Sequence, residues 1–220
     1  MKIALILAAG GQGRRFGQNK QLFLWKNKPL FIHTLEKFTS LERSRKAVLK
    51  ISQLIIVASD VRKFAKILKK YKVKYDNLVS GGQERYDSIR GGLAALRGEI
   101  THVLIHDGAR PNVTGSLVAR LKKALAKHPV VIPVVPLTDT IKIVRSNKVL
   151  STPKRAELFA AQTPQCFRKD ILLQAYARVD PQDCTDDAML VEKLGAPVYV
   201  VPGDPRNIKI TTKEDLRYIK

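Results

Sequence analysis

The chain has 220 residues, of which 45% are hydrophobic, and its 40 Lys and Arg against 19 Asp and Glu give a formal net charge of +21. This length suffices for one hydrophobic core, so we expect a single domain over residues 1–220. The first apolar run is too short to span a bilayer and runs into glycines without a signal-peptide cleavage pattern, and two cysteines fit neither a disulfide framework nor a zinc cluster. We therefore expect a cytoplasmic protein without a membrane partner.

The positive charge suits phosphorylated ligands, nucleic acids or anionic surfaces. Much of it falls between Arg43 and Lys74, at spacings typical of the solvated faces of helices. One alternative is therefore a nucleic-acid-binding module in which this stretch follows a phosphate backbone. The sequence shows neither a recognition motif nor an array of base-stacking aromatic residues, so we do not expect nucleic acid as the main partner.

Apolar runs rich in β-branched residues alternate with segments of helical periodicity. The expected strands are Lys2–Ala8, Gln53–Ser59, His102–His106, Val130–Val135 and Val198–Val201. The expected helices are Pro29–Thr39, Val61–Tyr71, Tyr86–Leu96, Gly115–Lys127, Lys169–Ala177 and Asp186–Leu194. Continuous hydrophobicity is typical of strands covered on both faces. The alternation predicts an α/β fold with a Rossmann-like, mostly parallel sheet flanked by helices.

The stretch 139–154 interrupts this alternation. Thr140–Arg145 and Lys148–Ser151 form two short polar strands joined by the turn-forming pair Ser146-Asn147. They predict an extended β-hairpin arm. Because a two-stranded arm is marginally stable alone, we expect it to pack against a second subunit, as the dimerisation arm of a homodimer.

The first motif, Ala8–Lys20, directly follows the first expected strand. Glycines at positions 10, 11, 13 and 17 let a phosphate chain approach the backbone N–H groups, and Arg14, Arg15 and Lys20 add full positive charges. Phe16 stands where a dinucleotide fingerprint has its third glycine, and the P-loop pattern does not occur. The motif predicts a triphosphate-binding loop, the alternative being a glycine-rich turn with incidental basic residues.

The second motif is His106–Pro111, at the carboxyl end of an expected strand. Beside a phosphate-binding loop, a carboxylate such as Asp107 would hold Mg²⁺ or another divalent cation together with the phosphates of a substrate. The alternative is that Asp107 caps a turn and pairs with Arg110. We expect His106 to be a packed residue at the strand end rather than a base.

Polar clusters also follow the later expected elements. In chain order the motifs read AGGxGxR with a later Lys-Gln, GGxxRxxS, HDxARP, DTxK, RxxLxxxQTPQxF, TDDA and NIKIT. This ordered set covers essentially the whole chain. It closely resembles the 2-C-methyl-D-erythritol 4-phosphate cytidylyltransferases of the non-mevalonate isoprenoid pathway.

The resemblance implies a fold of the nucleotide-diphospho-sugar transferase type. It also implies transfer of CMP from CTP to 2-C-methyl-D-erythritol 4-phosphate, a small sugar-alcohol phosphate, with release of pyrophosphate. Catalytic roles are implied for four cations: Arg15 and Lys20 at the triphosphate, and Arg155 and Lys209 at the methylerythritol phosphate, with Arg155 reaching across a dimer interface. Asp107 corresponds to the Mg²⁺-associated aspartate. The residues expected to bind substrates are Gly10, Gly11, Gly82, Gln83, Ser88, Arg110, Thr140, Thr163 and Thr185.

One departure from the family's pattern and one alternative substrate bear on this assignment. Arg206 stands where some members carry an acidic residue, so a second protein ligand for the metal is not predicted. The nearest alternative is a ribitol 5-phosphate cytidylyltransferase, which shares most of these motifs. HDGARP, TDDA and the RxxLxxxQTPQ spacing favour methylerythritol phosphate as the substrate.

Overall fold

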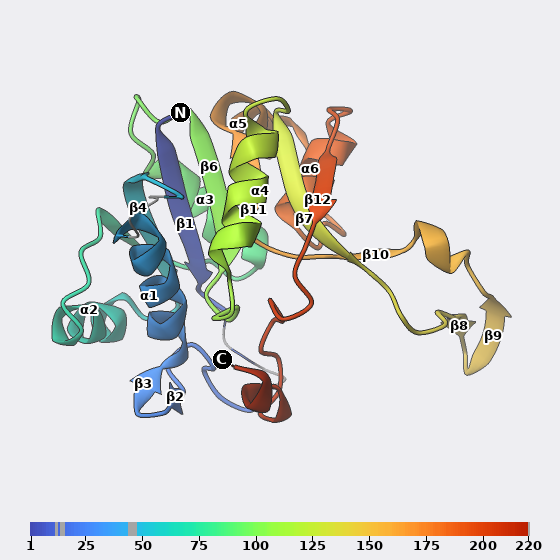
Figure 1. Cartoon of the computed structure of the whole chain (residues 1–220), viewed down its shortest axis with the longest axis horizontal. Coiled ribbons are helices and arrows are strands. Elements are labelled where there is room, and N and C mark those ends of the chain that lie inside the picture. The colour runs from blue at the N-terminus through green and yellow to red at the C-terminus, as the bar shows by residue number, and fades with distance from the viewer. Residues whose placement is uncertain (12, 14–15, 44–47, 220) are drawn as a thin grey trace.

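The computed structural model describes residues 1–219 except 12, 14–15 and 44–47. Its centre is an eight-stranded sheet of order β10-β7-β11-β6-β1-β4-β5, in which β12 also pairs with β7 (Figure 1). The strands of this sheet are β1 (Ile3–Ala9), β4 (Ile51–Ala58), β5 (Asn77–Ser80), β6 (His102–Asp107), β7 (Val130–Pro136), β10 (Phe159–Ala161), β11 (Gln165–Arg168) and β12 (Tyr199–Pro202).

The sheet is mostly parallel, as predicted. All five expected strands are present, as β1, β4, β6, β7 and β12, and β1 pairs in parallel with both β4 and β6. Strand β11 lies between β6 and β7 and runs antiparallel to both, and β10 runs antiparallel to β7. The unpredicted strands β5, β10 and β11 have only three or four residues, too few to show a period.

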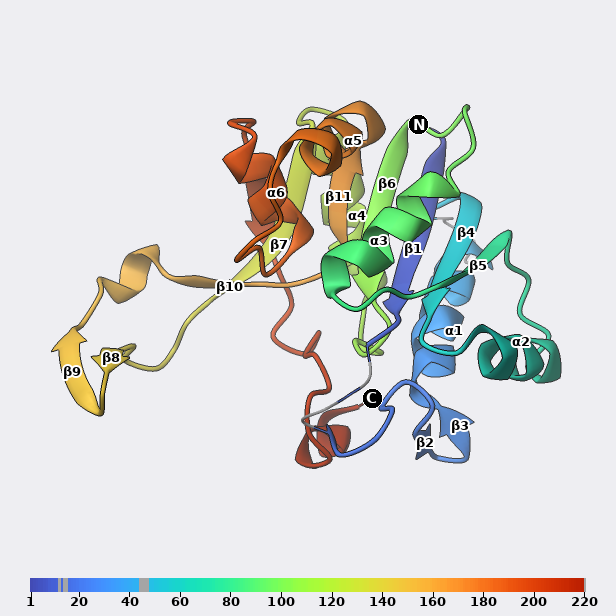
Figure 2. The ribbon, with the colours of Figure 1, turned by 180° about the vertical axis from the view of Figure 1, so that it is seen from behind.

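Helices cover both faces of the sheet (Figures 1 and 2). They are α1 (Leu30–Arg43), α2 (Val61–Lys70), α3 (Arg85–Ala94), α4 (Gly115–Leu125), α5 (Lys169–Arg178) and α6 (Asp187–Lys193). Alternate residues of β1 point to opposite faces: Leu5 packs with α1 and α4, whereas Ile6 packs with α3, α5 and α6. None of the helices within the described residues has the length and apolar character that crossing a bilayer requires.

The predicted hairpin arm projects away from the body of the molecule (Figures 1 and 2). It consists of β8 (Ile143–Arg145) and β9 (Lys148–Ser151), so its first strand is shorter than the expected Thr140–Arg145. Ser146 and Asn147 have φ values of 46° and 62°, the left-handed pair that a tight hairpin turn needs. Its apolar side chains are exposed, with Val149 at 60% and Leu150 at 55%.

The remaining elements are short. A small hairpin, β2 (Leu24–Trp25) and β3 (Lys28–Pro29), follows the first loop. Two 3-10 turns, η2 (Arg155–Glu157) and η3 (Glu214–Tyr218), lie after the arm and near the C-terminus. The C-terminal end and the first loop meet near the carboxyl ends of β1 and β6, where open α/β sheets bind ligands (Figure 1).

Candidate active site

A cavity of about 390 Å³ opens at the carboxyl ends of β1 and β6. Its walls come from four parts of the chain: the first glycine-rich loop, the start of α3, the loop after β6 and the segment before η3. Eight of the predicted site residues line it: Gly10, Gly11, Lys20, Gly82, Gln83, Ser88, Asp107 and Lys209. The structure thus brings together motifs that are far apart in the sequence.

The first loop is held in shape from both ends. Gly13 has a φ of +73°, and a Cβ there would lie 2.2 Å from the carbonyl oxygen of Gln18, so only glycine fits. Phe16 is buried against Phe23, with ring centroids 5.2 Å apart. Asn19 Nδ2 donates a hydrogen bond of 2.7 Å to Ser59 Oγ. These contacts fix Lys20 at the cavity wall, whereas the predicted Arg15 and its neighbour at position 14 lie outside the described residues.

The second wall joins the loop after β5 to α3. Ser88 Oγ accepts a hydrogen bond of 3.0 Å from the backbone N–H of Gly82. A Cβ on Gly81 would lie 3.0 Å from Gly10 Cα, so the two glycine-containing loops touch backbone to backbone. The predicted substrate-binding residues Gly10, Gly82 and Ser88 therefore form one continuous surface.

Gly82→Ala is expected to disturb this wall. The added methyl group would lie 2.2 Å from Asp87 Cβ on the first turn of α3, so the turn or the loop must move. We expect the free energy of unfolding to fall by about 2 kcal/mol and activity to fall with it. Gly98→Ala is the matched control, because a Cβ there meets no atom within 4 Å. Equal melting temperatures for the two variants would contradict this packing.

Asp107 lies at the centre of a cluster of cations. Its Oδ2 is 3.1 Å from Lys209 Nζ and 3.2 Å from Arg110 Nε, and its Oδ1 is 3.9 Å from Arg85 Nε. Burial raises the pKa of this carboxyl group, but Lys209, Arg85 and Arg110 together lower it well below its ordinary value. Asp107 is therefore ionised at neutral pH, and the pairing with Arg110, expected as the alternative to metal binding, is present.

The carboxylate also fits a hard cation. Among the described residues there is no group of three or more His, Cys, Asp or Glu side chains that could hold a metal. Mg²⁺ in phosphate-binding sites commonly takes one or two carboxylates and completes its shell with water and substrate phosphates. Asp107 is a single carboxylate at the cavity wall, and it would be the one protein ligand of such a cation. The basic residue Arg206, which raised the question of a second ligand, is paired with Asp204 at 2.8 Å.

His106 is linked through Thr163 to the backbone of Asp107. Its ring is fully buried against Phe38, and burial lowers its pKa to about 4. Because the Arg110 carbonyl can only accept, the neutral ring donates from Nε2 to that oxygen at 3.1 Å, and Nδ1 accepts from Thr163 Oγ1 at 3.1 Å. Thr163 Oγ1 in turn accepts from the Asp107 backbone N–H. His106 is thus a packed residue, as predicted, and Thr163 lies behind the cavity rather than in its wall.

This burial gives a prediction for the titration of His106. The imidazole is expected to remain neutral from pH 8 down to pH 5, because its pKa lies near 4 rather than 6.5. Since the unfolded chain takes up this proton at higher pH, the His106 contribution to stability falls as pH drops from about 6.5 toward 4. The measurement is an NMR titration of the ring signals, in which a midpoint near 6.5 would show that the ring is not buried in this way.

The segment before η3 carries Lys209 into the site. Ile210 N–H donates to the Ala109 carbonyl at 2.8 Å, and Arg110 Nη1 donates to the Asn207 carbonyl at 2.8 Å. Asn207 Nδ2 donates to the Thr163 carbonyl at 2.8 Å. The predicted residues Arg110 and Thr163 therefore connect the motifs that hold Asp107 and Lys209.

Three predicted site residues lie elsewhere in the described part of the protomer. Arg155 begins η2 beside the arm, where its Nη1 donates to the Thr138 carbonyl at 2.8 Å. Thr140 is exposed near the base of the arm, and Thr185 is exposed just before α6. The structure does not bring them into the cavity lining.

Arg85 is a cavity residue that was not among the predicted site residues. Its guanidinium contacts Asp107 on one side, and on the other its Nη2 lies 2.6 Å from Asp187 Oδ2. The motifs GGQER and TDDA each contain one member of this ion pair. Their pairing could not be predicted, because it depends on how α3 and α6 pack on the same face of the sheet.

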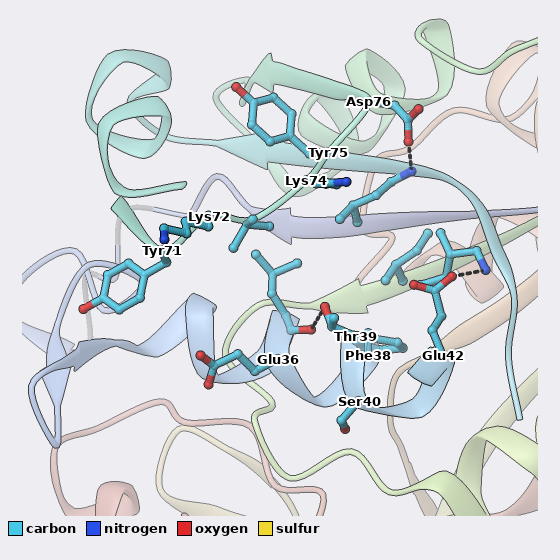
Figure 3. A pocket seen from close by; sticks show the side chains of 15 residues that line it. Glu36, Phe38, Thr39, Ser40, Glu42, Tyr71, Lys72, Lys74, Tyr75 and Asp76 are labelled. Atoms are coloured by element: carbon cyan, nitrogen blue, oxygen red, sulfur yellow. Dashed lines mark hydrogen bonds between the residues drawn. The ribbon is translucent and has the colours of Figure 1, made fainter. Parts of the chain in front are cut away.

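A larger cavity, of about 750 Å³, lies between α1, β4 and the segment 71–76 (Figure 3). Its lining mixes apolar core residues such as Phe38 with Glu42 and Asp76, which accept backbone hydrogen bonds from Ile51 and Leu54. It contains none of the predicted site residues, so the smaller cavity is the candidate active site.

The fold and this cavity, with its glycine-rich loop, its carboxylate and its lysines at the ends of parallel strands, define a nucleotidyltransferase. Residues 3–220 match the family model described as IspD, 2-C-methyl-D-erythritol 4-phosphate cytidylyltransferase. The chain belongs to this family.

Individual relatives agree with the family match. The chain is 40% identical to the 2-C-methyl-D-erythritol 4-phosphate cytidylyltransferase of Alkaliphilus metalliredigens over 98% of this chain and 90% of the relative. It is also 40% identical to that of Carboxydothermus hydrogenoformans, over 99% and 93%. A crystal structure of 4-diphosphocytidyl-2C-methyl-D-erythritol synthase from Anaerococcus prevotii superimposes with a TM-score of 0.82 at 30% identity, covering 99% of this chain and 96% of that one.

Proposed function

We propose that the 390 Å³ cavity binds CTP and 2-C-methyl-D-erythritol 4-phosphate and joins them with release of pyrophosphate. This is the activity of the family, the CTP-dependent step of the non-mevalonate pathway. One observation supports this cavity as the location of the reaction: Lys20, Asp107 and Lys209 line the same cavity, beside a glycine-rich loop.

The chemistry requires cations rather than a base. A phosphate oxygen of the alcohol phosphate attacks the α-phosphorus of CTP, the new P–O bond forms, and the bond to the β-phosphate oxygen breaks with its electron pair leaving on pyrophosphate. Because the nucleophile is already an anion at neutral pH, no side chain must remove a proton. Buried, neutral His106 is consistent with this. The protein must bring two polyanions together and stabilise the charge that develops.

The proposed roles follow the positions of the side chains. Lys20 would stabilise the triphosphate during attack, together with Arg15, which lies outside the described residues. Lys209 would orient the phosphate of the alcohol. Asp107 would hold Mg²⁺, which would neutralise phosphate charge when bound. The loop of Gly82 and Gln83, held by Ser88, would recognise cytosine through backbone groups, a role in which rigidity matters more than side-chain identity.

We also propose a homodimer in which Arg155 completes the partner's site. Arg155 lies next to an arm whose apolar side chains, Ile143, Val149 and Leu150, are about half exposed or more. Exposed apolar surface of this kind is typical of an interface.

Cys166 and Cys184 are both free thiols, which agrees with a reducing compartment, and we expect the protein to be located in the cytoplasm.

Mixing two inactive variants tests the shared site. Arg155→Ala and Lys20→Ala are each expected to be inactive, but a heterodimer would contain one cavity with both Lys20 and Arg155 intact. After the variants are mixed and allowed to exchange subunits, up to about a quarter of the wild-type activity should return, if subunits pair at random. Activity that stays at the level of the separate variants, with subunit exchange confirmed by mass spectrometry, would contradict the shared site.

The function itself is tested by pyrophosphate release with CTP. We expect release with 2-C-methyl-D-erythritol 4-phosphate and little with ribitol 5-phosphate or without an alcohol phosphate. Release with ribitol phosphate alone would instead identify the related ribitol enzyme. Release with neither, from folded protein supplied with Mg²⁺, would overturn the proposed function.

A further inference from the structure

Arg85 connects two aspartates that come from different parts of the fold. It is the first residue of α3 and lines the active-site cavity, where its side chain is 29% exposed. Nε faces Asp107 Oδ1 at 3.9 Å, while Nη2 lies 2.6 Å from Asp187 Oδ2 on α6. A guanidinium has a rigid planar fork of five N–H donors, so it can face both carboxylates at once in a fixed relative orientation.

Asp187 is itself held by a third residue. It is 1% exposed, and its Oδ1 accepts a hydrogen bond of 2.6 Å from the hydroxyl of Tyr176 on α5. Burial and the adjacent Asp187 charge raise the pKa of Tyr176, so its hydroxyl keeps its proton and remains a donor. A buried carboxylate is costly unless it is paired and hydrogen-bonded, so Asp187 is tied to both Arg85 and Tyr176.

The Tyr176 ring is fixed in turn. It stacks on the ring of Tyr86, with centroids 4.7 Å apart and planes 6° from parallel. Tyr86 OH donates to the Tyr176 carbonyl at 2.8 Å. The three side chains Tyr176, Asp187 and Arg85 therefore form a chain of contacts from the α5–α6 layer to Asp107. Within the described residues, neither α5 nor α6 supplies a side chain to the cavity wall.

We propose that Tyr176 and Asp187 are positioning residues that hold Arg85 against Asp107 and so set the orientation of this carboxylate in the active site. Asp107 has no other neighbour at Oδ1 among the ion pairs of the described residues, whereas Oδ2 is held by Lys209 and Arg110. Arg85 therefore determines the side of the carboxylate that is not fixed by the HDGARP loop. The catalytic part of this inference rests on the proposed function.

The test compares Asp187→Asn and Tyr176→Phe with a matched control, Tyr86→Phe. The control keeps the ring that stacks on Tyr176 and removes only a hydroxyl whose partner is the Tyr176 main-chain carbonyl, so the contact between the Tyr176 side chain and Asp187 stays in place. We expect kcat to fall roughly tenfold or more in Asp187→Asn and severalfold in Tyr176→Phe, as for other residues that orient a functional ligand. The Mg²⁺ concentration for half-maximal rate should rise in both, while Tyr86→Phe keeps both quantities near wild type.

A second measurement does not depend on turnover. The guanidinium N–H signals of Arg85, whose Nη2 lies 2.6 Å from the buried Asp187 Oδ2, should exchange slowly with solvent in the ligand-free wild type and in Tyr86→Phe, and rapidly in the other two variants. Melting temperatures show whether each variant folds. If Asp187→Asn does not fold, the result for Tyr176→Phe decides whether the positioning role holds. Unchanged exchange and unchanged kcat in folded Tyr176→Phe would overturn the positioning role. If the wild-type protein shows no turnover but the exchange pattern of the four proteins is as expected, only the proposed function is overturned.

Discussion

Lys20→Ala is expected to lower kcat at least about a hundredfold, as does removal of one transition-state donor in other enzymes. Lys20 lies at the end of the glycine-rich loop and lines the cavity together with Asp107 and Lys209. Its ammonium group is proposed to stabilise charge that increases on the triphosphate during attack, so its loss should raise the barrier more than it weakens CTP binding. Pyrophosphate release under saturating CTP measures this effect directly.

The fold should survive the substitution. The loop is anchored by the buried ring of Phe16 and by the hydrogen bond of Asn19, and the substitution leaves both in place, so the melting temperature is expected to stay within a few degrees of the wild type. Lys66→Ala is a suitable control, because Lys66 is exposed on α2 and is not part of the cavity wall. A Lys20→Ala enzyme with near-normal kcat would remove Lys20 from the mechanism, whatever its effect on KM.

Asp107→Asn is expected to affect both activity and stability. The change leaves Lys209, Arg110 and Arg85 without their shared counter-charge, and breaking a buried ion pair in this way costs about 3 kcal/mol. Turnover should fall about a hundredfold or more, since the cations lose the group that orients them and the proposed Mg²⁺ site loses its carboxylate. Urea unfolding measures the loss of stability, and pyrophosphate release measures the loss of turnover.

The stability effect should depend on pH in a defined direction. Burial opposes ionisation, but the three cations prevail, so the folded-state pKa of Asp107 lies below the ordinary value of 3.8. Such a group contributes stability above the unfolded-state pKa, and the contribution is lost as pH falls through the folded-state pKa. The difference between wild type and Asp107→Asn should therefore be full at pH 7 and shrink below about pH 4.

Asp60→Asn provides the comparison for this series. Asp60 caps α2 and faces Lys63 at 3.6 Å in an exposed position, and asparagine caps helices as well as aspartate does. The same chemical change there should alter stability far less than Asp107→Asn does, because an exposed ion pair is screened by water. If Asp107→Asn were equally mild, the charge cluster around Asp107 would not contribute in the way its geometry indicates.

The sequence predicted those parts of the fold that have a local cause. Strands β1, β4 and β6 are continuous apolar runs, and the turn at Ser146 and Asn147 has its own residue preference. The insertion of β11 between β6 and β7 has no such cause. Its four residues are fixed by pairing with partners on either side, and pairing between distant segments leaves no period in the sequence.

The site could be predicted to a similar extent. Lys20 and Asp107 each follow a predicted strand, and the carboxyl ends of parallel strands meet at one edge of the sheet, so these two residues were expected together, whereas Gly82 was assigned to the site by the family resemblance. The ion pair between Arg85 and Asp187 depends on how α3 and α6 pack on the same face. That packing is decided by the hydrophobic core as a whole, which no single motif records.

The arm has a consequence for how the enzyme responds to its own abundance. Phe159 and the exposed apolar side chains of β8 and β9 lie on a part of the chain that projects into solvent, and the proposed catalytic Arg155 lies between them. If Arg155 acts in the neighbouring subunit, a newly synthesised chain is inactive until it meets another. Output per molecule would then rise with protein concentration and level off only well above the dimer dissociation constant, so that dilution below this constant switches the enzyme off without unfolding it.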